Sequence, residues 1–144
     1  MRKLILFVSI LLCFLIAPLA ATAGDYDGSR SLLLSVIRVL ECTPDGACGE
    51  KTPASVGLPQ FLKIDFTNKT IGPAAAGDDT PVTTIERQEV VDGKLILQGA
   101  EDGYEKMRDG LGWTMAISEE SGQVVLTGSG EQVGFVIFGA CLPL

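Results

Sequence analysis

The sequence predicts an all-β domain, built as a small antiparallel β-barrel or a β-sandwich of about seven strands, with a lipocalin-like architecture among the options. Three observations support this fold class: short segments in which apolar and polar residues alternate, explicit hairpin turns, and 17 glycines that all lie beyond residue 23. Strict alternation places apolar and polar side chains on opposite faces of a strand. The sequence leaves the choice between barrel and sandwich open.

The first 23 residues have the three regions of a secretory signal peptide. Arg2 and Lys3 form a basic start, residues 4–16 are apolar except for Ser9, and the segment ends in the cleavable pattern Ala-Thr-Ala. An uncleaved anchor is the alternative, since the apolar run is about long enough to cross a bilayer. We therefore expect a signal peptide at 1–23, a single β domain at 24–144, a periplasmic or secreted location, and no membrane insertion after cleavage.

The charge of the expected mature chain excludes several classes of function. Removing residues 1–23 takes away two of the 11 basic residues and none of the 18 acidic ones, so the net charge changes from −7 to −9. An acidic chain does not neutralise phosphates, which excludes nucleic acid as a partner. The sequence contains no histidine, which excludes Ser-His-Asp catalysis and His-ligated zinc. We expect no metal and no cofactor.

The first elements are less regular than the later ones. Residues 31–41 are apolar at most positions and fit a helix or a strand, and their β-branched content favours a strand. Thr52 followed by Pro53 predicts a single helical turn, because Thr is a good N-cap and proline suits the first helical position. Residues 62–66 alternate, with Leu62 and Ile64 on the core face, and predict a strand.

A meander of five strands is expected to follow. The sequence Val-Asp-Gly-Lys at 91–94 is a strong hairpin signal. Phe138 interrupts the alternation in the last strand, which indicates that this strand is buried on both faces or lies under a loop. Glycine-rich stretches at 72–80 and 100–111 predict loops. The five expected strands are 82–90, 94–99, 112–118, 123–128 and 132–139.

The expected mature chain keeps three cysteines: Cys42, Cys48 and Cys141. The Pro-Asp-Gly turn inside the first pair should bring Cys42 and Cys48 together. On the chain-entropy model their seven-residue loop contributes about 2.4 kcal/mol, against about 4.7 for a bridge from Cys42 to Cys141. Proximity in sequence favours the Cys42–Cys48 disulfide. We expect this bridge to have a structural role, because a metal site would lack histidine ligands and the cysteine spacing is not that of redox motifs.

The interior of the sheet is the first candidate binding site. Trp113, Met115, Phe135 and Ile137 are expected to face inward and to line a cavity of a few hundred Å³. The favoured hypothesis is therefore an exported protein that binds a small apolar ligand without catalysis. No catalytic residue is predicted, since no pair of carboxylates is distinguished and the serines lack a base.

The alternative function is a protein-binding module, such as an inhibitor of a cationic hydrolase. Its partner would contact the charged loop at 100–111, where Tyr104, Met107 and Arg108 are residue types that anchor interfaces. The net negative charge would attract a cationic protein.

Four segments carry a resemblance to a known group of proteins: CTPDGAC at 42–48, LPQFLKIDFTNKTI at 58–71, GWTMAISEESGQVVLTGSG at 112–130 and VGFVIFGAC at 133–141. With them the chain resembles a group of small exported proteobacterial hypothetical proteins, from about Leu32 to Cys141. The resemblance implies export and a β domain, and it implies no activity. It also implies that relatives have a cysteine at the position of Leu34, as a partner for the residue at 141.

Overall fold

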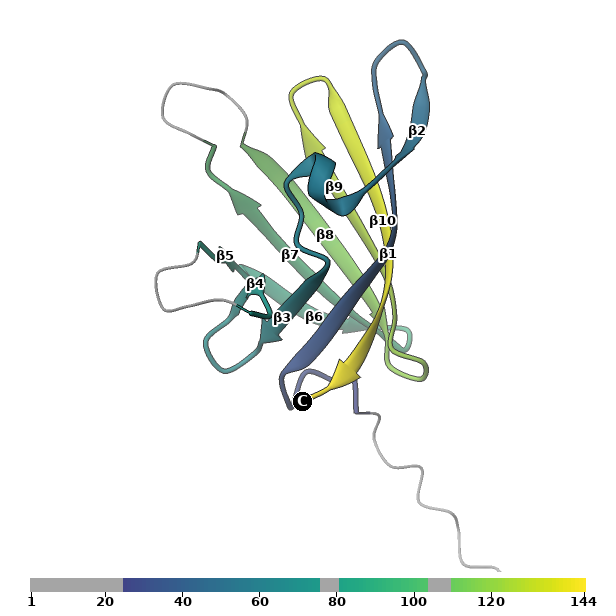
Figure 1. The fold of residues 1–144 in the computed structure, drawn as a ribbon. Helices are drawn as coiled ribbons and strands as arrows, with labels where there is room; N and C mark the ends of the chain where they lie inside the picture. The colour runs from purple at the N-terminus through teal and green to yellow at the C-terminus, as the bar shows by residue number, and fades with distance from the viewer. Residues whose placement is uncertain (1–24, 76–80, 104–109) are drawn as a thin grey trace, which may run out of the picture.

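A computed structural model describes residues 25–75, 81–103 and 110–144 (Figure 1). Most of these residues lie in β-strands. The expected signal peptide at 1–23 lies outside the described residues. The all-β fold class is confirmed. The strands are β1 (Leu32–Cys42), β2 (Cys48–Lys51), β3 (Phe61–Asp65), β4 (Thr70–Pro73), β5 (Thr83–Thr84), β6 (Arg87–Val91), β7 (Lys94–Glu101), β8 (Leu111–Ser118), β9 (Gln123–Gly130) and β10 (Val133–Pro143), with a 3-10 helix η1 at Pro53–Val56.

The strands form one antiparallel sheet that curls into a half-barrel (Figure 1). Its order is β5-β4-β3-β1-β10-β9-β8-β7-β6, with β2 paired to β1. Only Ile85 and Glu86 separate the two outermost strands, β5 and β6. The Ile85 N–H donates to the carbonyl of Lys69 (2.8 Å) and the Glu86 N–H to the carbonyl of Gln98 (2.9 Å). This segment therefore passes from one edge of the sheet to the other.

Strand β1 holds the two halves of the sheet together. Strand β10 pairs with its whole length, while β3 pairs with its first part and β2 with its last part. The register shifts between Val36 and Arg38, and the Ile37 side chain at this bulge is 69% exposed. A bulge changes which side chains face inward. As a result, Val36 and Val39 are both buried although they are three residues apart.

The core fills the inner face of the curled sheet. Trp113, Met115 and Ile117 share this face on β8, as the alternation predicts. The indole N–H of Trp113 donates to Oγ1 of Thr83 (3.0 Å), so β8 is linked across β7 to β5. The buried apolar residues are Leu32, Leu34, Val36, Val39, Leu62, Ile64, Ile71, Ile85, Leu95, Leu97, Trp113, Met115, Ile117, Val124, Ile137 and Cys141.

Several expectations about individual strands are wrong. The expected strand 82–90 is divided into β5 and β6, because the chain there changes its pairing from β4 to β7. Strands β2 and β4 have four residues each, too few for a periodic signal, and β4 includes the start of the expected loop at 72–80. Phe138 is neither buried nor under a loop: its side chain is 39% exposed on the outer face of β10. The single helical turn at Thr52 is confirmed as η1.

Candidate functional site

The predicted disulfide is present and joins the two strands of the β1–β2 hairpin. Cys42 and Cys48 are bonded and lie directly opposite each other in the register. The Asp45 carboxylate accepts a hydrogen bond from the Thr43 hydroxyl (2.6 Å), the main cause of the lowered pKa of Asp45. Cys141 is a buried free thiol, and burial raises its pKa to about 12. These positions support a structural role for the bridge.

The four residues predicted to line an interior cavity lie together on the inner face. Trp113 and Phe135 both flank Gly128 in the register, and Met115 and Ile137 lie in the next row, on either side of Leu126. Met115, Trp113 and Ile137 belong to the buried core, whereas Phe135 is only partly buried. The structure thus brings the predicted set together as part of the core.

The predicted partner-binding loop at 100–111 lies partly outside the residues that the structure describes. Tyr104, Met107 and Arg108 lie outside the described residues, so their placement as a partner-binding loop stays a prediction. The described flanks of the expected loop at 100–111 are partly strand, since β7 ends at Glu101 and β8 begins at Leu111.

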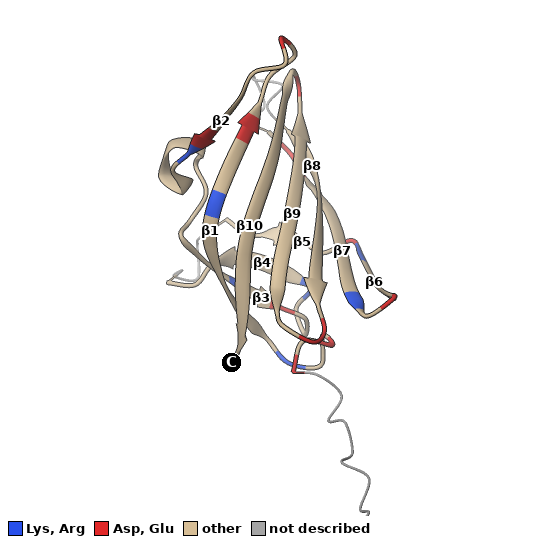
Figure 2. Cartoon of the chain, turned by 90° about the vertical axis from the view of Figure 1, so that its right-hand side faces the viewer, with Lys and Arg blue, Asp and Glu red and all other residues tan. Residues whose placement is uncertain are grey.

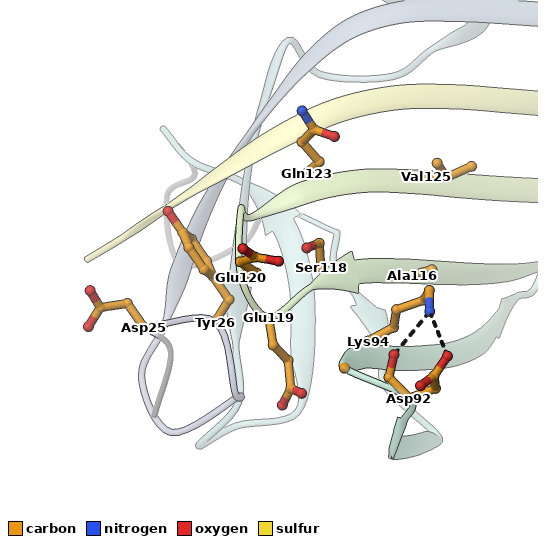
Figure 3. Close-up of a pocket in the computed structure, with 11 residues that line it drawn as sticks. Asp25, Tyr26, Asp92, Lys94, Ala116, Ser118, Glu119, Glu120, Gln123 and Val125 are labelled. Atoms are coloured by element: carbon orange, nitrogen blue, oxygen red, sulfur yellow. Dashed lines mark hydrogen bonds and ion pairs between the residues drawn. The ribbon is translucent and has the colours of Figure 1, made fainter. Parts of the chain in front are cut away.

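An open groove of about 840 Å³ lies at the other end of the meander, near the N-terminal segment (Figure 3). Four parts of the chain contribute to it: the segment before β1, the β6–β7 turn, the end of β8 with the β8–β9 turn, and β9. The lining residues are Asp25, Tyr26, Asp92, Gly93, Lys94, Ala116, Ser118, Glu119, Glu120, Gln123 and Val125.

Backbone hydrogen bonds hold the two turns of the groove together. The Glu119 N–H donates to the carbonyl of Gly93 (3.0 Å), which joins the β8–β9 turn to the β6–β7 turn. The β8–β9 turn closes on itself, since the Gly122 N–H donates to the carbonyl of Ser118 (2.9 Å). The carboxylates at this end are therefore carried by a fixed backbone.

Tyr26 brings the N-terminal segment onto the same site. A Cβ atom at Gly122 would lie 2.5 Å from Cε1 of Tyr26, so the ring packs directly on the turn backbone. Only glycine leaves this space free. A local turn precedes β1, where Asp27 accepts a hydrogen bond from the Ser29 N–H (2.8 Å). Hydrogen bonding by the Ser29 side chain, and secondly by this N–H, lowers the pKa of Asp27.

The groove is acidic. Asp25, Asp92, Glu119 and Glu120 line it, against a single lysine, Lys94. The Lys94 ammonium lies 3.0 Å from the carbonyl oxygen and 3.6 Å from the carboxylate of Asp92, so its charge is already matched (Figure 3). Glu119 and Glu120 form no ion pair within residues 25–75, 81–103 and 110–144. The site therefore offers unpaired negative charge to a ligand.

The floor of the groove is apolar and continues onto the outer face of the sheet. Ala116 on β8 lies opposite Val125 on β9, and Val125 lies opposite Phe138 on β10. Strands β8, β9 and β10, of 8, 8 and 11 residues, contain no Asp, Glu, Lys or Arg. Figure 2 shows this outer face with the acidic turn at one end of it. Carboxylates and an exposed apolar surface thus adjoin each other.

The polar and charged side chains of the described residues lie at the surface of the fold. Across the described ranges, no three Cys, Asp or Glu side chains gather as metal ligands, and no charged side chain is buried. The groove has carboxylates and Ser118, and the chain has no histidine to activate a hydroxyl. Among the same residues there is no helix with the length and apolar character needed to cross a membrane. Comparison with protein-family models, with curated proteins and with solved structures finds no match to this chain.

Strand alternation does not predict the groove, although the sequence contains one signal for it. Successive hairpin turns of a meander alternate between its two ends, so the turns after the strands 82–90 and 112–118 lie at the same end. Both turns carry carboxylates, at Asp92 and at Glu119 and Glu120. The contribution of Asp25 and Tyr26 had no such signal, because nothing in the sequence places the segment before β1 on the β8–β9 turn.

Proposed function

We propose that the chain is an exported, non-catalytic binding protein whose acidic groove takes a basic segment of a partner protein. The observation that carries this proposal is the groove itself, where four carboxylates adjoin an apolar floor. Asp25 and Asp92 pair with Arg30 and Lys94, whereas Glu119 and Glu120 have no ion pair among the described residues. A lysine or arginine of the partner would enter a site with unpaired negative charge. The apolar floor would receive the aliphatic part of such a side chain.

The expected strength follows from the exposure of these groups. Ion pairs between solvent-exposed groups contribute about 0.2–1 kcal/mol each, so the charges alone give weak binding. Their larger effect is on the association rate, which electrostatic attraction raises at low salt. We therefore expect an interaction whose association rate falls steeply as salt is added, because charges in water are screened over about 10 Å at 0.1 M salt.

The test measures binding of a fluorescent lysine-rich peptide to the protein at two salt concentrations. The double variant Glu119→Gln/Glu120→Gln should weaken binding by about two- to thirtyfold at low salt, because each of the two lost ion pairs contributes about 0.2–1 kcal/mol. The matched control is Glu101→Gln/Glu131→Gln, which removes the same charge at the other end of the meander and should change binding less than twofold. If both double variants weaken binding equally, the peptide responds to net charge alone and the groove is not the site.

A small apolar ligand inside the half-barrel is the second candidate function. It is supported by Leu111, Leu126 and Phe135, which pack on the core from the inner face and remain partly exposed. Titration with a long-chain fatty acid should change the emission of Trp113, the only tryptophan, and Phe135→Ala should weaken the response. An unchanged emission spectrum at saturating fatty acid would eliminate this candidate.

A further inference from the structure

The outer face next to the groove has an exposed apolar pair that the core does not require. Val125 and Phe138 are opposite each other on β9 and β10, and their side chains are 41% and 39% exposed. Side chains at directly opposite positions in an antiparallel pair are about 5 Å apart, so the two form one apolar patch. Ala116, opposite Val125 on β8, extends this patch into the groove.

The surroundings of the patch select an uncharged ligand group. The three strands that carry it have no charged residue, so burying their outer face requires no desolvation of an ion. The nearest charge in the register is Arg38, which lies opposite Phe138 on β1 and forms an ion pair with Glu50 (3.4 Å). An apolar side chain of a ligand fits this patch, whereas a basic side chain fits the turn below it.

The separation of the two subsites is set by strand geometry. On β9, Gln123 begins the strand directly after the acidic turn, and Val125 follows two residues later. At about 3.3 Å per residue, the carboxylates of the turn lie about 7–13 Å from the apolar patch. An extended peptide has the same rise, so it would cover this distance in two to four residues.

We infer that the partner presents an extended segment with an aromatic or aliphatic side chain two to four residues from a basic one, and that Val125 and Phe138 bind the apolar side chain. This inference rests on the proposed function and adds to it the class of sequence that is recognised. A polypeptide is the occupant that this surface favours, because it carries a basic and an apolar side chain at a fixed distance. An anionic membrane would be repelled by the carboxylates beside the patch.

The experiment uses fluorescent peptides with two adjacent lysines and one phenylalanine in a Gly-Ser background. The spacing between them is varied from zero to six residues, and one peptide lacks phenylalanine. Peptides with one to three intervening positions should bind five- to tenfold more tightly than the peptide without phenylalanine. Phe138→Ser should abolish this preference while leaving binding of the phenylalanine-free peptide unchanged, and Phe138→Leu should retain it.

The matched control is Phe61→Ser, which removes a phenylalanine that is 51% exposed on β3, and it should leave the preference intact. If all spacings bind alike, or if Phe138→Ser and Phe61→Ser act equally, the inference is wrong while the proposed function stands. If none of the peptides binds, both are wrong. If the protein binds zwitterionic lipid vesicles through Phe138 and shows no peptide preference, the patch is a membrane contact and the inference is overturned.

Discussion

Replacing Leu34 with cysteine is expected to create a second disulfide, to Cys141. The two residues lie directly opposite each other on β1 and β10, and both side chains point into the core. The Cys141 N–H donates to the carbonyl of Gly122 (2.8 Å), away from β1, so Leu34 and Cys141 form a non-hydrogen-bonded pair. In such pairs the Cα atoms are about 4.5 Å apart, within the range that a disulfide spans.

The magnitude comes from two opposing terms. A bridge between positions 34 and 141 closes a loop of 108 residues (141 minus 34, plus one). The chain-entropy model gives about 4.8 kcal/mol for a loop of that size. Truncating a fully buried leucine to cysteine costs about 2 kcal/mol, at the lower end of the range for leucine to alanine. The oxidised variant should therefore be about 2–3 kcal/mol more stable than the wild type, which raises Tm by about 8–12 °C.

The assay is urea and thermal denaturation of wild type and Leu34→Cys, each with and without reductant, since reductant also opens the Cys42–Cys48 bridge. Intact mass under non-reducing conditions should show the loss of two further hydrogens in the variant. The matched control is Leu33→Cys, whose side chain points to the outer face, opposite Leu142, and cannot reach Cys141. A Leu34→Cys protein that folds with two free thiols, or a Leu33→Cys protein that forms the bridge, would refute the assigned register.

Three further predictions concern the core and the turns. Cys141 is 2% exposed and burial raises its pKa to about 12, so iodoacetamide at pH 8 should label it at least 100-fold more slowly in the native protein than in urea, and equal rates would contradict its burial. Gly99→Ala places a Cβ against the Thr84 carbonyl oxygen and 2.5 Å from Cζ2 of Trp113, so urea denaturation should show that the free energy of unfolding falls by about 1–3 kcal/mol. The control Gly112→Ala adds a Cβ in open space on β8 and should change this free energy by less than about 0.5 kcal/mol. Equal effects of the two substitutions would mean that the indole does not pack on Gly99. The pKa of Asp65 lies below its usual 3.8, chiefly because the carboxylate accepts a hydrogen bond from the Asn68 N–H, and also because it pairs with Lys63. Asp65 therefore contributes its full stabilisation above pH 3.8, and this contribution is lost as the pH falls through the lower pKa of the folded state. Thermal denaturation of Asp65→Asn from pH 6 to pH 2 should therefore show a deficit that disappears in acid, and a deficit independent of pH would contradict the assignment.

The later strands could be predicted from the sequence because each of them carries two independent signals. The Asp-Gly turn at 92–93 has positive φ at both residues (48° and 70°), as a tight hairpin requires, and β7 begins at Lys94 as expected. Alternation and turn position agree in β8 and β9 as well. Where only one signal exists, prediction fails: β2 has no buried residue, and its pairing to β1 depends on the hairpin that the Cys42–Cys48 disulfide closes.

The groove depends on contacts that strand periodicity does not encode. Alternation assigns each side chain to a face, and it correctly places Trp113 and Met115 on the core face. It does not show that the outer face stays uncovered, so Phe138 indicates, wrongly, a last strand that is buried on both faces or lies under a loop. The outer apolar face and the acidic turn become one surface only because the Glu119 N–H joins two hairpins and Tyr26 packs on Gly122. A groove of this kind forms where turns from separate hairpins meet, and strand periodicity does not show which turns meet. For this reason the sequence predicts a binding surface on the charged loop at 100–111, whereas Asp92, Glu119 and Glu120 line the groove in the structure.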